Sequence, residues 1–235
     1  MTNNTRPKFL KPSLFDDGDR NAPTDSNKSA ATIDRLNELE SQHELVKFNA
    51  NRDSSIQVQR QQLPIFKYRN QILYALETHR VLIVVGETGS GKSTQLPQYL
   101  LESGWTSSTK SICVTEPRRI AAINLAKRIC DEKSFVLGEE VGFSIRFEDC
   151  HTPGVTRIKM VTEGLLIREL MQMPMLDKYS VIILDEVHER NTNTDILIGL
   201  LKKIMNRRDD LKLIICSATV DAEQIKLDRG PLISH

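Results

Sequence analysis

The stretch VLIVVGETGSGKS, from Val81 to Ser93, joins an apolar run to a glycine-rich turn that matches the pattern G-x-x-x-x-G-K-[ST]. The residues that follow, Thr94 to Leu101, have the spacing of a helix. Glycines tolerate positive φ, so successive backbone N–H groups can face a phosphate at the positive end of that helix. The stretch therefore predicts a strand, a phosphate-binding loop and a helix. The alternative reading is an ordinary glycine-rich turn between a strand and a helix.

Nucleotide binding by this loop assigns specific roles to its side chains. We expect the Lys92 ammonium to reach the β- and γ-phosphates of ATP, and the Ser93 hydroxyl to bind Mg²⁺. The predicted nucleotide-binding residues of the loop are Gly86, Glu87, Thr88, Gly89, Ser90, Gly91, Lys92, Ser93 and Thr94.

Four further runs are similar to the first one in composition. They are nearly continuous in apolar residues, and helical patterns about a dozen residues long separate them. The runs span residues 111–115, 157–161, 180–185 and 212–217. Such runs suit strands that are covered on both faces, so the sequence predicts an α/β fold with a parallel sheet. Ligands of these sheets bind beyond the carboxyl ends of the strands.

Charged residues follow the fourth apolar run of the chain. The run ends in Asp185 and Glu186, with His188 two residues further on. A carboxylate at the end of a buried strand in a P-loop fold can hold Mg²⁺, and a second one can orient or deprotonate the attacking water. Taken alone, such a pair of charged residues is also common wherever a strand ends at the protein surface. His188 by itself is more often a surface or hydrogen-bonded histidine than a catalyst.

The composition is that of a globular chain, and it excludes several function classes. The 235 residues carry 32 Lys and Arg against 31 Asp and Glu, a net charge of +1. No global field therefore draws the chain to nucleic acid or membrane. The apolar runs are too short to span a bilayer, and the polar N-terminus does not resemble a secretory signal. Four widely spaced cysteines suggest neither a zinc site nor disulfides, as expected in a reducing intracellular compartment.

The composition also predicts how the chain is divided. Residues 1–31 are polar and predict a disordered arm. Residues 32–63 predict a helical extension, in which an amphipathic segment from Thr32 to Phe48 suits docking or packing. Residues 64–223 form the predicted nucleotide-binding domain, and residues 224–235 a divergent tail.

Six motifs in a fixed order resemble the DEAH-box family of superfamily 2 RNA helicases. The likeness extends over about residues 61–225. The motifs are the phosphate loop, Thr115 to Ala122 (TEPRRIAA), Ile145 to Asp149 (IRFED), Thr162 to Leu166 (TEGLL), Asp185 to Arg190 (DEVHER) and Ser217 to Thr219 (SAT).

The resemblance implies a RecA-like ATP-binding domain that hydrolyses ATP while it remodels single-stranded RNA. By this resemblance Asp185, Glu186 and His188 are catalytic: Asp185 and Ser93 hold the metal, and Glu186 acts on the hydrolytic water. The family also implies that Arg128 stacks on the adenine.

The remaining implied roles concern RNA and its coupling to hydrolysis. Arg118, Arg119 and Thr162 would touch the RNA backbone, and Ser217 and Thr219 would couple hydrolysis to strand movement. The likeness is strongest to splicing-associated members, which implies spliceosomal proteins as partners, a nuclear location and no membrane partner.

The chain departs from the family pattern at three places. Glu116 stands where the family usually has Gln, which puts a negative charge near the expected RNA path, and Val187 replaces the usual Ala. After Glu223 the likeness fades, and the second motor domain, which supplies arginine fingers in the family, is not part of the chain. We therefore expect an open sheet edge, no unwinding by the chain alone and very slow hydrolysis.

Two other functions remain open from the sequence. One is a truncated isoform that binds ATP and RNA without catalysis. The other, a different P-loop ATPase or a nucleotide kinase, is disfavoured by the box from Asp185 to His188 and by the SAT motif.

Overall fold

The computed structural model describes residues 55–219 and 232–234. The predicted disordered arm, the segment from Thr32 to Phe48 and most of the predicted tail lie outside these residues.

One sheet of eight strands forms the centre of the described part, in the order β4-β3-β5-β2-β6-β7-β1-β8. The strands are β1 (Val81–Val85), β2 (Ser111–Glu116), β3 (Val141–Ile145), β4 (Glu148–Cys150), β5 (Ile158–Thr162), β6 (Tyr179–Leu184), β7 (Lys212–Ser217) and β8 (Leu232–Ser234). Neighbouring strands are parallel except for the antiparallel pair β3 and β4. The predicted α/β fold with a parallel sheet is confirmed.

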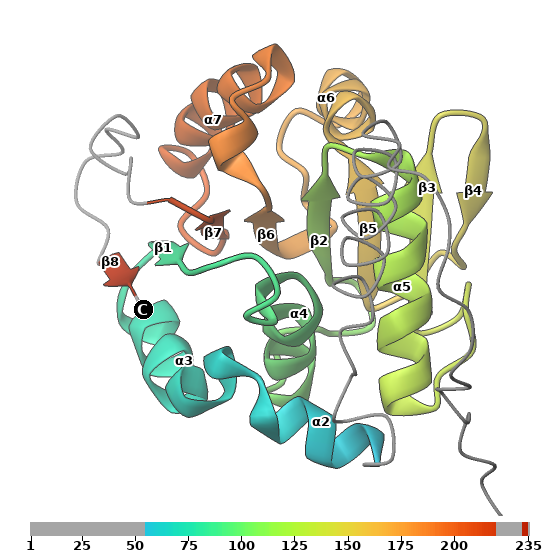
Figure 1. Cartoon of the computed structure of the whole chain (residues 1–235). Helices are drawn as coiled ribbons and strands as arrows, with labels where there is room; N and C mark the ends of the chain where they lie inside the picture. The colour runs from blue at the N-terminus through green and yellow to red at the C-terminus, as the bar shows by residue number, and fades with distance from the viewer. Residues whose placement is uncertain (1–54, 220–231, 235) are drawn as a thin grey trace, which may run out of the picture. The chain divides into compact units, whose positions relative to one another are not determined.

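Helices cover both faces of this sheet (Figure 1). The helical elements are α2 (Ile56–Gln62), the 3-10 turn η1 (Pro64–Tyr68), α3 (Arg69–Thr78), α4 (Lys92–Glu102), α5 (Arg119–Lys133), α6 (Glu163–Gln172), the 3-10 turn η2 (Val187–Glu189) and α7 (Thr192–Met205). Helices α3, α4 and α5 pack on one face, and α6 and α7 pack on the other. No helix in the described part is both long enough and apolar enough to cross a membrane.

Alternate residues of each central strand enter the two cores. In β6, Val181 and Ile183 pack with α3, α4 and α5, whereas Ile182 and Leu184 pack with α6 and α7. All four side chains are buried. Two-sided burial explains why the five predicted runs are continuously apolar, and each of them is a strand.

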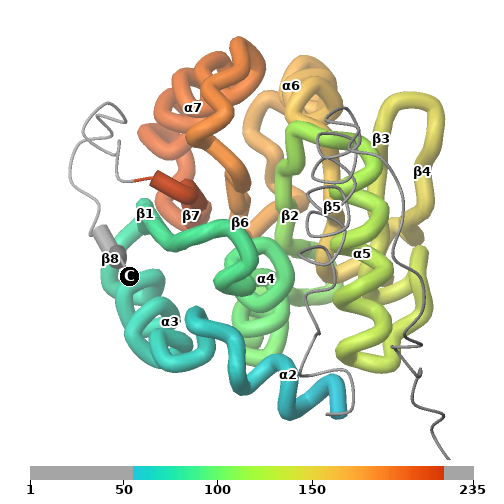
Figure 2. The backbone as a smooth tube through the Cα atoms, in the orientation of Figure 1, coloured from blue at the N-terminus to red at the C-terminus, as the bar shows by residue number. Residues whose placement is uncertain are grey.

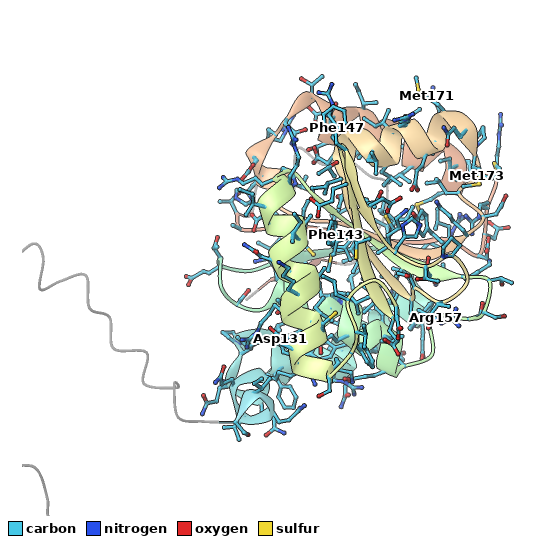
Figure 3. All side chains as sticks on the ribbon, turned by 90° about the vertical axis from the view of Figure 1, so that its right-hand side faces the viewer. Asp131, Phe143, Phe147, Arg157, Met171 and Met173 are labelled. Atoms are coloured by element: carbon cyan, nitrogen blue, oxygen red, sulfur yellow. The ribbon has the colours of Figure 1, made fainter. Side chains whose placement is uncertain are left out.

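The hairpin of β3 and β4 was not among the predicted strands. Strand β3 contains Gly142 and Ser144, and β4 is polar and largely exposed, so neither gives a continuous apolar run. Phe143 lies between α5 and the sheet, whereas Phe147 projects from the turn of the hairpin (Figure 3). Phe147 has a φ of +75° and is 88 % exposed, with the Arg146 guanidinium 4.7 Å from its ring centroid.

Strand β8 pairs with β1 in parallel, with Ile83 opposite Leu232 and Val85 opposite Ser234. The edge strand on this side of the sheet is therefore β8 and not β1.

The strand order places the motifs at one edge of the sheet. Strands β2, β6, β7 and β1 are consecutive neighbours and parallel, so their carboxyl ends lie side by side. The phosphate loop, Pro117, Asp185 and Ala218 each follow one of these ends. Ligands of open α/β sheets bind at this edge.

Candidate nucleotide and RNA site

Glycine backbones shape the phosphate loop between β1 and α4. Gly89 and Gly91 have φ of +84° and +96°, and Gly91 is the N-cap of α4. A Cβ on Gly91 would lie 2.9 Å from Cδ1 of Leu63, which precedes η1. The backbone nitrogen of Ile65 also donates to Ser90 O at 3.2 Å. The loop is therefore held from outside by the segment that precedes α3.

Lys92 is folded back into the loop and is only 4 % exposed. Its Nζ donates to Gly86 O at 2.5 Å, to Glu87 O at 2.9 Å and to Ser90 Oγ at 3.4 Å. The ammonium thus lies within the loop backbone, where a bound phosphate would compete with carbonyl oxygens for its three protons. In contrast, Thr94 donates to Gly91 O at 3.3 Å, so its hydroxyl is used inside α4.

The two carboxylates after β6 have different surroundings. Asp185 is 1 % exposed, and its Oδ1 accepts from Glu186 N at 2.8 Å. Glu186 has a φ of +52°, the left-handed conformation that is strained for residues other than glycine. Burial, and next the charge of Asp185, raise the pKa of Glu186, which makes it a stronger base than an ordinary glutamate.

Glu116 is a third carboxyl group at this edge of the sheet. It ends β2, is 3 % exposed and borders the same cavity as Ser93 and Glu186. Burial, followed by the charge of Asp185, raises the pKa of Glu116 to about 9. The raised pKa favours the protonated form of Glu116 beside the Asp185 carboxylate. The sequence expectation placed this charge near the RNA path, and the structure places it on the nucleotide side.

His188 links the turn after β6 to the end of β7. Its Nδ1 lies 3.3 Å from Oε2 of Glu186 and 3.3 Å from the backbone nitrogen of Ala218. Nδ1 accepts from Ala218 when it carries no proton, and it donates to Glu186 when it carries one. Nearby, Ser217 Oγ donates to Thr219 O at 2.9 Å, and Ser217 O accepts from Gly86 N at 3.1 Å. The SAT motif therefore contacts both the phosphate loop and the box that begins at Asp185.

A cavity of about 570 Å³ lies in front of these groups. Its lining includes predicted residues from three motifs, namely Thr88, Ser93, Arg118, Glu186 and His188, together with the predicted Arg128 of α5. Arg118, an expected RNA contact, donates to Glu189 Oε1 at 2.7 Å, so its guanidinium is paired with the acidic box.

A second cavity, of about 380 Å³, contains the other predicted RNA contacts. Arg119 and Thr162 line it together with two arginines from other elements, Arg146 and Arg168, which sequence reasoning did not single out. Thr162 is the N-cap of α6, yet its side chain makes no capping hydrogen bond. The structure therefore separates Arg119 from Arg118, although they are neighbours in the chain.

Helix α2 lies within the predicted helical extension of residues 32–63, but its contribution to the site was not predicted. Figure 2 shows α2 beside α4 and close to the C-terminal end of α5. Gln57 Nε2 donates to Glu132 O at 3.2 Å, and Arg60 Nε lies 3.5 Å from Glu132 Oε2. Glu132 also accepts from Arg128 Nε at 2.7 Å, four residues earlier in α5. The i,i+4 spacing of Arg128 and Glu132 was the one available signal in the sequence.

The residues at this edge fit a Mg²⁺ ion that arrives with a nucleotide. Asp185 Oδ2 is buried and accepts no hydrogen bond from an N–H group of the described residues. No group of three or more His, Cys, Asp or Glu side chains in the described part could hold a metal by itself. Mg²⁺ is usually held by one or two carboxylates together with substrate phosphates. Asp185 and the Ser93 hydroxyl would be the protein ligands.

Comparisons with known proteins agree with this arrangement. The family model described as DEAD/DEAH box helicase matches residues 66–227. The "Probable ATP-dependent RNA helicase DHX35" of Homo sapiens is 55 % identical over 181 residues, which cover 77 % of this chain and 26 % of that protein. The Pongo abelii protein of the same name is also 55 % identical over 181 residues, covering 77 % of this chain and 25 % of that protein. The "Probable ATP-dependent RNA helicase DHX35 homolog" of Caenorhabditis elegans is 53 % identical over 172 residues, covering 73 % and 23 %.

The chain spans about a quarter of the length of the curated relatives that it matches. The matched residues contain the phosphate loop, both cavities and the box that begins at Asp185. The chain therefore belongs to the DEAD/DEAH box helicase family.

Proposed function

We propose that this chain is the ATP-binding part of a DEAH-box, ATP-dependent RNA helicase. The observation that carries the proposal is that Ser93 of the phosphate loop and Glu186 after β6 line one cavity at the carboxyl edge of the sheet, with Lys92 and Asp185 adjacent to them in the chain. Family membership and the names of the relatives support ATP and RNA as the ligands.

Each residue of the site has a distinct task in this proposal. Backbone N–H groups of the loop and Lys92 hold the phosphates, while Ser93 and Asp185 hold Mg²⁺. The ion would neutralise charge that develops on the phosphate oxygens. Glu186 orients the attacking water and takes up its proton, a task that its raised pKa favours. His188 passes the state of this site to Ala218 and the SAT motif.

RNA is proposed to bind along the second cavity, where Arg119, Arg146 and Arg168 gather near the N-terminus of α6. A motor that passes over any sequence should contact sugar and phosphate rather than base edges. Spliceosomal partners and a nuclear location are proposals that the DEAH-box resemblance alone supports.

A second candidate function is binding of ATP and RNA without productive turnover. The matched residues correspond to about a quarter of each relative. In the family a second domain supplies arginine fingers, which accelerate phosphoryl transfer by about 10³ to 10⁵. This length of chain by itself would then bind ATP but hydrolyse it slowly.

Steady-state ATP turnover separates the two candidates. The chain, its Lys92→Ala variant and its Lys159→Ala variant are compared with and without single-stranded RNA. Lys159 is a matched control because it is also buried but pairs with Glu169 at 3.0 Å, away from both cavities. Turnover that needs Lys92 and rises with RNA supports the hydrolase. A folded chain that binds ATP without turnover supports the binding function.

A further inference from the structure

Arg128 points into the nucleotide cavity from the middle of α5, and one carboxylate holds it. Its side chain is 44 % exposed, and its guanidinium borders the cavity that also contains Thr88 and Ser93. The Nε atom donates to Glu132 Oε1 at 2.7 Å. Glu132 itself does not line the cavity.

Glu132 is buried, and its second oxygen is held by three further side chains. Its Oε2 accepts from Gln95 Nε2 at 2.8 Å and from Gln98 Nε2 at 2.7 Å, both on α4. Arg60 Nε of α2 lies 3.5 Å from the same oxygen and donates to Gln95 Oε1 at 3.0 Å. Because both oxygens are engaged, the carboxylate has one orientation, and the direction of the Arg128 side chain is fixed with it.

We propose that Glu132 is a positioning residue for nucleotide binding, which holds the Arg128 guanidinium so that its flat face meets a purine base. Arg60 completes the support, so α2 is part of the base-binding wall of the cavity. Gln59 of the same helix lies 3.5 Å from Arg128 Nη2 and limits its swing. The inference rests on the nucleotide site proposed above.

The physical reason is preorganisation of a flexible side chain. A guanidinium over an aromatic ring stabilises a complex modestly, and the gain is largest when the side chain is already ordered before binding. Without Glu132, Arg128 would have to be ordered by the nucleotide. The loss should not affect binding of the phosphates, because the residues proposed to hold them are Lys92 and the loop backbone, and Lys92 has no contact with Glu132.

The test compares the affinity for Mg²⁺–ATP with that for Mg²⁺–tripolyphosphate, which has the phosphates but no base. Glu132→Gln keeps the size of the side chain but removes its charge. It should weaken ATP binding about tenfold and leave tripolyphosphate binding within about twofold. Glu169→Gln is the matched control, since Glu169 is similarly enclosed by Lys159, Lys178 and Tyr179 on the other face of the sheet. It should change neither affinity.

A second variant keeps the test decisive if Glu132→Gln folds poorly. Arg128→Met alters a half-exposed side chain, so it should fold and lose the same selectivity for ATP. In the double variant, Glu132→Gln should cause no further loss of ATP affinity, because Glu132 acts only through Arg128. Equal losses for ATP and tripolyphosphate, or fully additive losses, would overturn the positioning role.

Lys92→Ala distinguishes this inference from the site on which it rests. It should weaken ATP and tripolyphosphate alike. If Lys92→Ala weakens binding of neither ligand, the proposed nucleotide site is wrong, and the proposed role of Glu132 is then wrong as well. If Lys92→Ala weakens both ligands but neither Glu132→Gln nor Arg128→Met changes the selectivity for ATP, only the positioning inference is wrong.

Discussion

The Nδ1 atom of His188 lies 3.3 Å from the backbone nitrogen of Ala218, which joins the turn after β6 to the residues after β7. The same atom lies 3.3 Å from Oε2 of Glu186. One imidazole nitrogen thus faces both the proposed base and the SAT motif. We propose that His188 carries the state of the proposed nucleotide site to the SAT motif.

Replacing His188 by Ala should uncouple the two ligands without removing either. We expect ATP and RNA each to bind alone within about twofold of the parent, whereas the factor by which ATP changes RNA affinity should fall towards one. Fluorescence anisotropy of labelled RNA, with and without Mg²⁺–ATP, measures this factor. His79→Ala, at an exposed histidine after α3, is the control. An unchanged coupling factor in His188→Ala would rule out this route.

Glu116→Gln should stabilise the chain increasingly as the pH rises. The folded state raises the pKa of Glu116 from 4.5 to about 9, so its favourable contribution is full below about pH 4.5 and is lost as the pH rises towards 9. Glutamine has no such dependence. Urea unfolding without Mg²⁺ should show the variant more stable by at least about 1 kcal/mol at pH 8, and less so at pH 5. Glu148→Gln, in exposed β4, should show no such trend. A pH-independent difference for Glu116→Gln would contradict the buried-acid account.

The two neighbouring arginines should differ in their effect on RNA. Arg119→Gln should weaken RNA binding similarly for all sequences and reduce the salt slope by about 1, because one phosphate contact is lost. Arg118→Gln should have the smaller effect, since Glu189 holds that guanidinium at 2.7 Å on the nucleotide side. Binding isotherms over a range of KCl concentrations test the pair. A larger loss for Arg118 than for Arg119, or a loss confined to one sequence, would be the contrary result.

Gly91 and Gly104 form a matched pair for the shape of the phosphate loop. Both have positive φ, +96° and +78°, but a Cβ on Gly91 would meet Leu63 at 2.9 Å, whereas nothing lies within 4 Å of one on Gly104. Gly104→Ala should therefore lower the free energy of unfolding by about 1 kcal/mol through backbone strain. Gly91→Ala should lower it by roughly 2 to 4 kcal/mol and should also weaken ATP binding. Chemical unfolding measures both. Equal losses of unfolding free energy in the two variants would show that the contact with Leu63 does not destabilise Gly91→Ala.

The central strands could be predicted because a strand that is buried on both faces has apolar residues at nearly every position. The same rule fails for β3, where Gly142 and Ser144 interrupt the run. Strand β4 is held by its hairpin partner rather than by burial, so its residues Glu148–Cys150 carry no apolar signal.

The site divides in a similar way. Lys92, Asp185 and Ser217 belong to contiguous motifs, so local patterns were sufficient to select them. The support of Arg128 comes from α2, α4 and α5, and only the fold brings Arg60, Gln95 and Glu132 together. The burial of Glu116 had a usable signal that was missed: strand alternation places it on the same face as Ile112 and Val114, both of which pack with α5.

Calorimetric titration of the chain with Mg²⁺–ATP tests the proposed nucleotide site, comparing the parent with Lys92→Ala and Lys159→Ala. We expect one ATP per parent chain, unchanged binding by Lys159→Ala, and a loss of at least about tenfold in Lys92→Ala, because the buried ammonium would make charge-assisted hydrogen bonds to phosphate. Equal ATP affinity in the parent and Lys92→Ala would contradict the assignment of the nucleotide site.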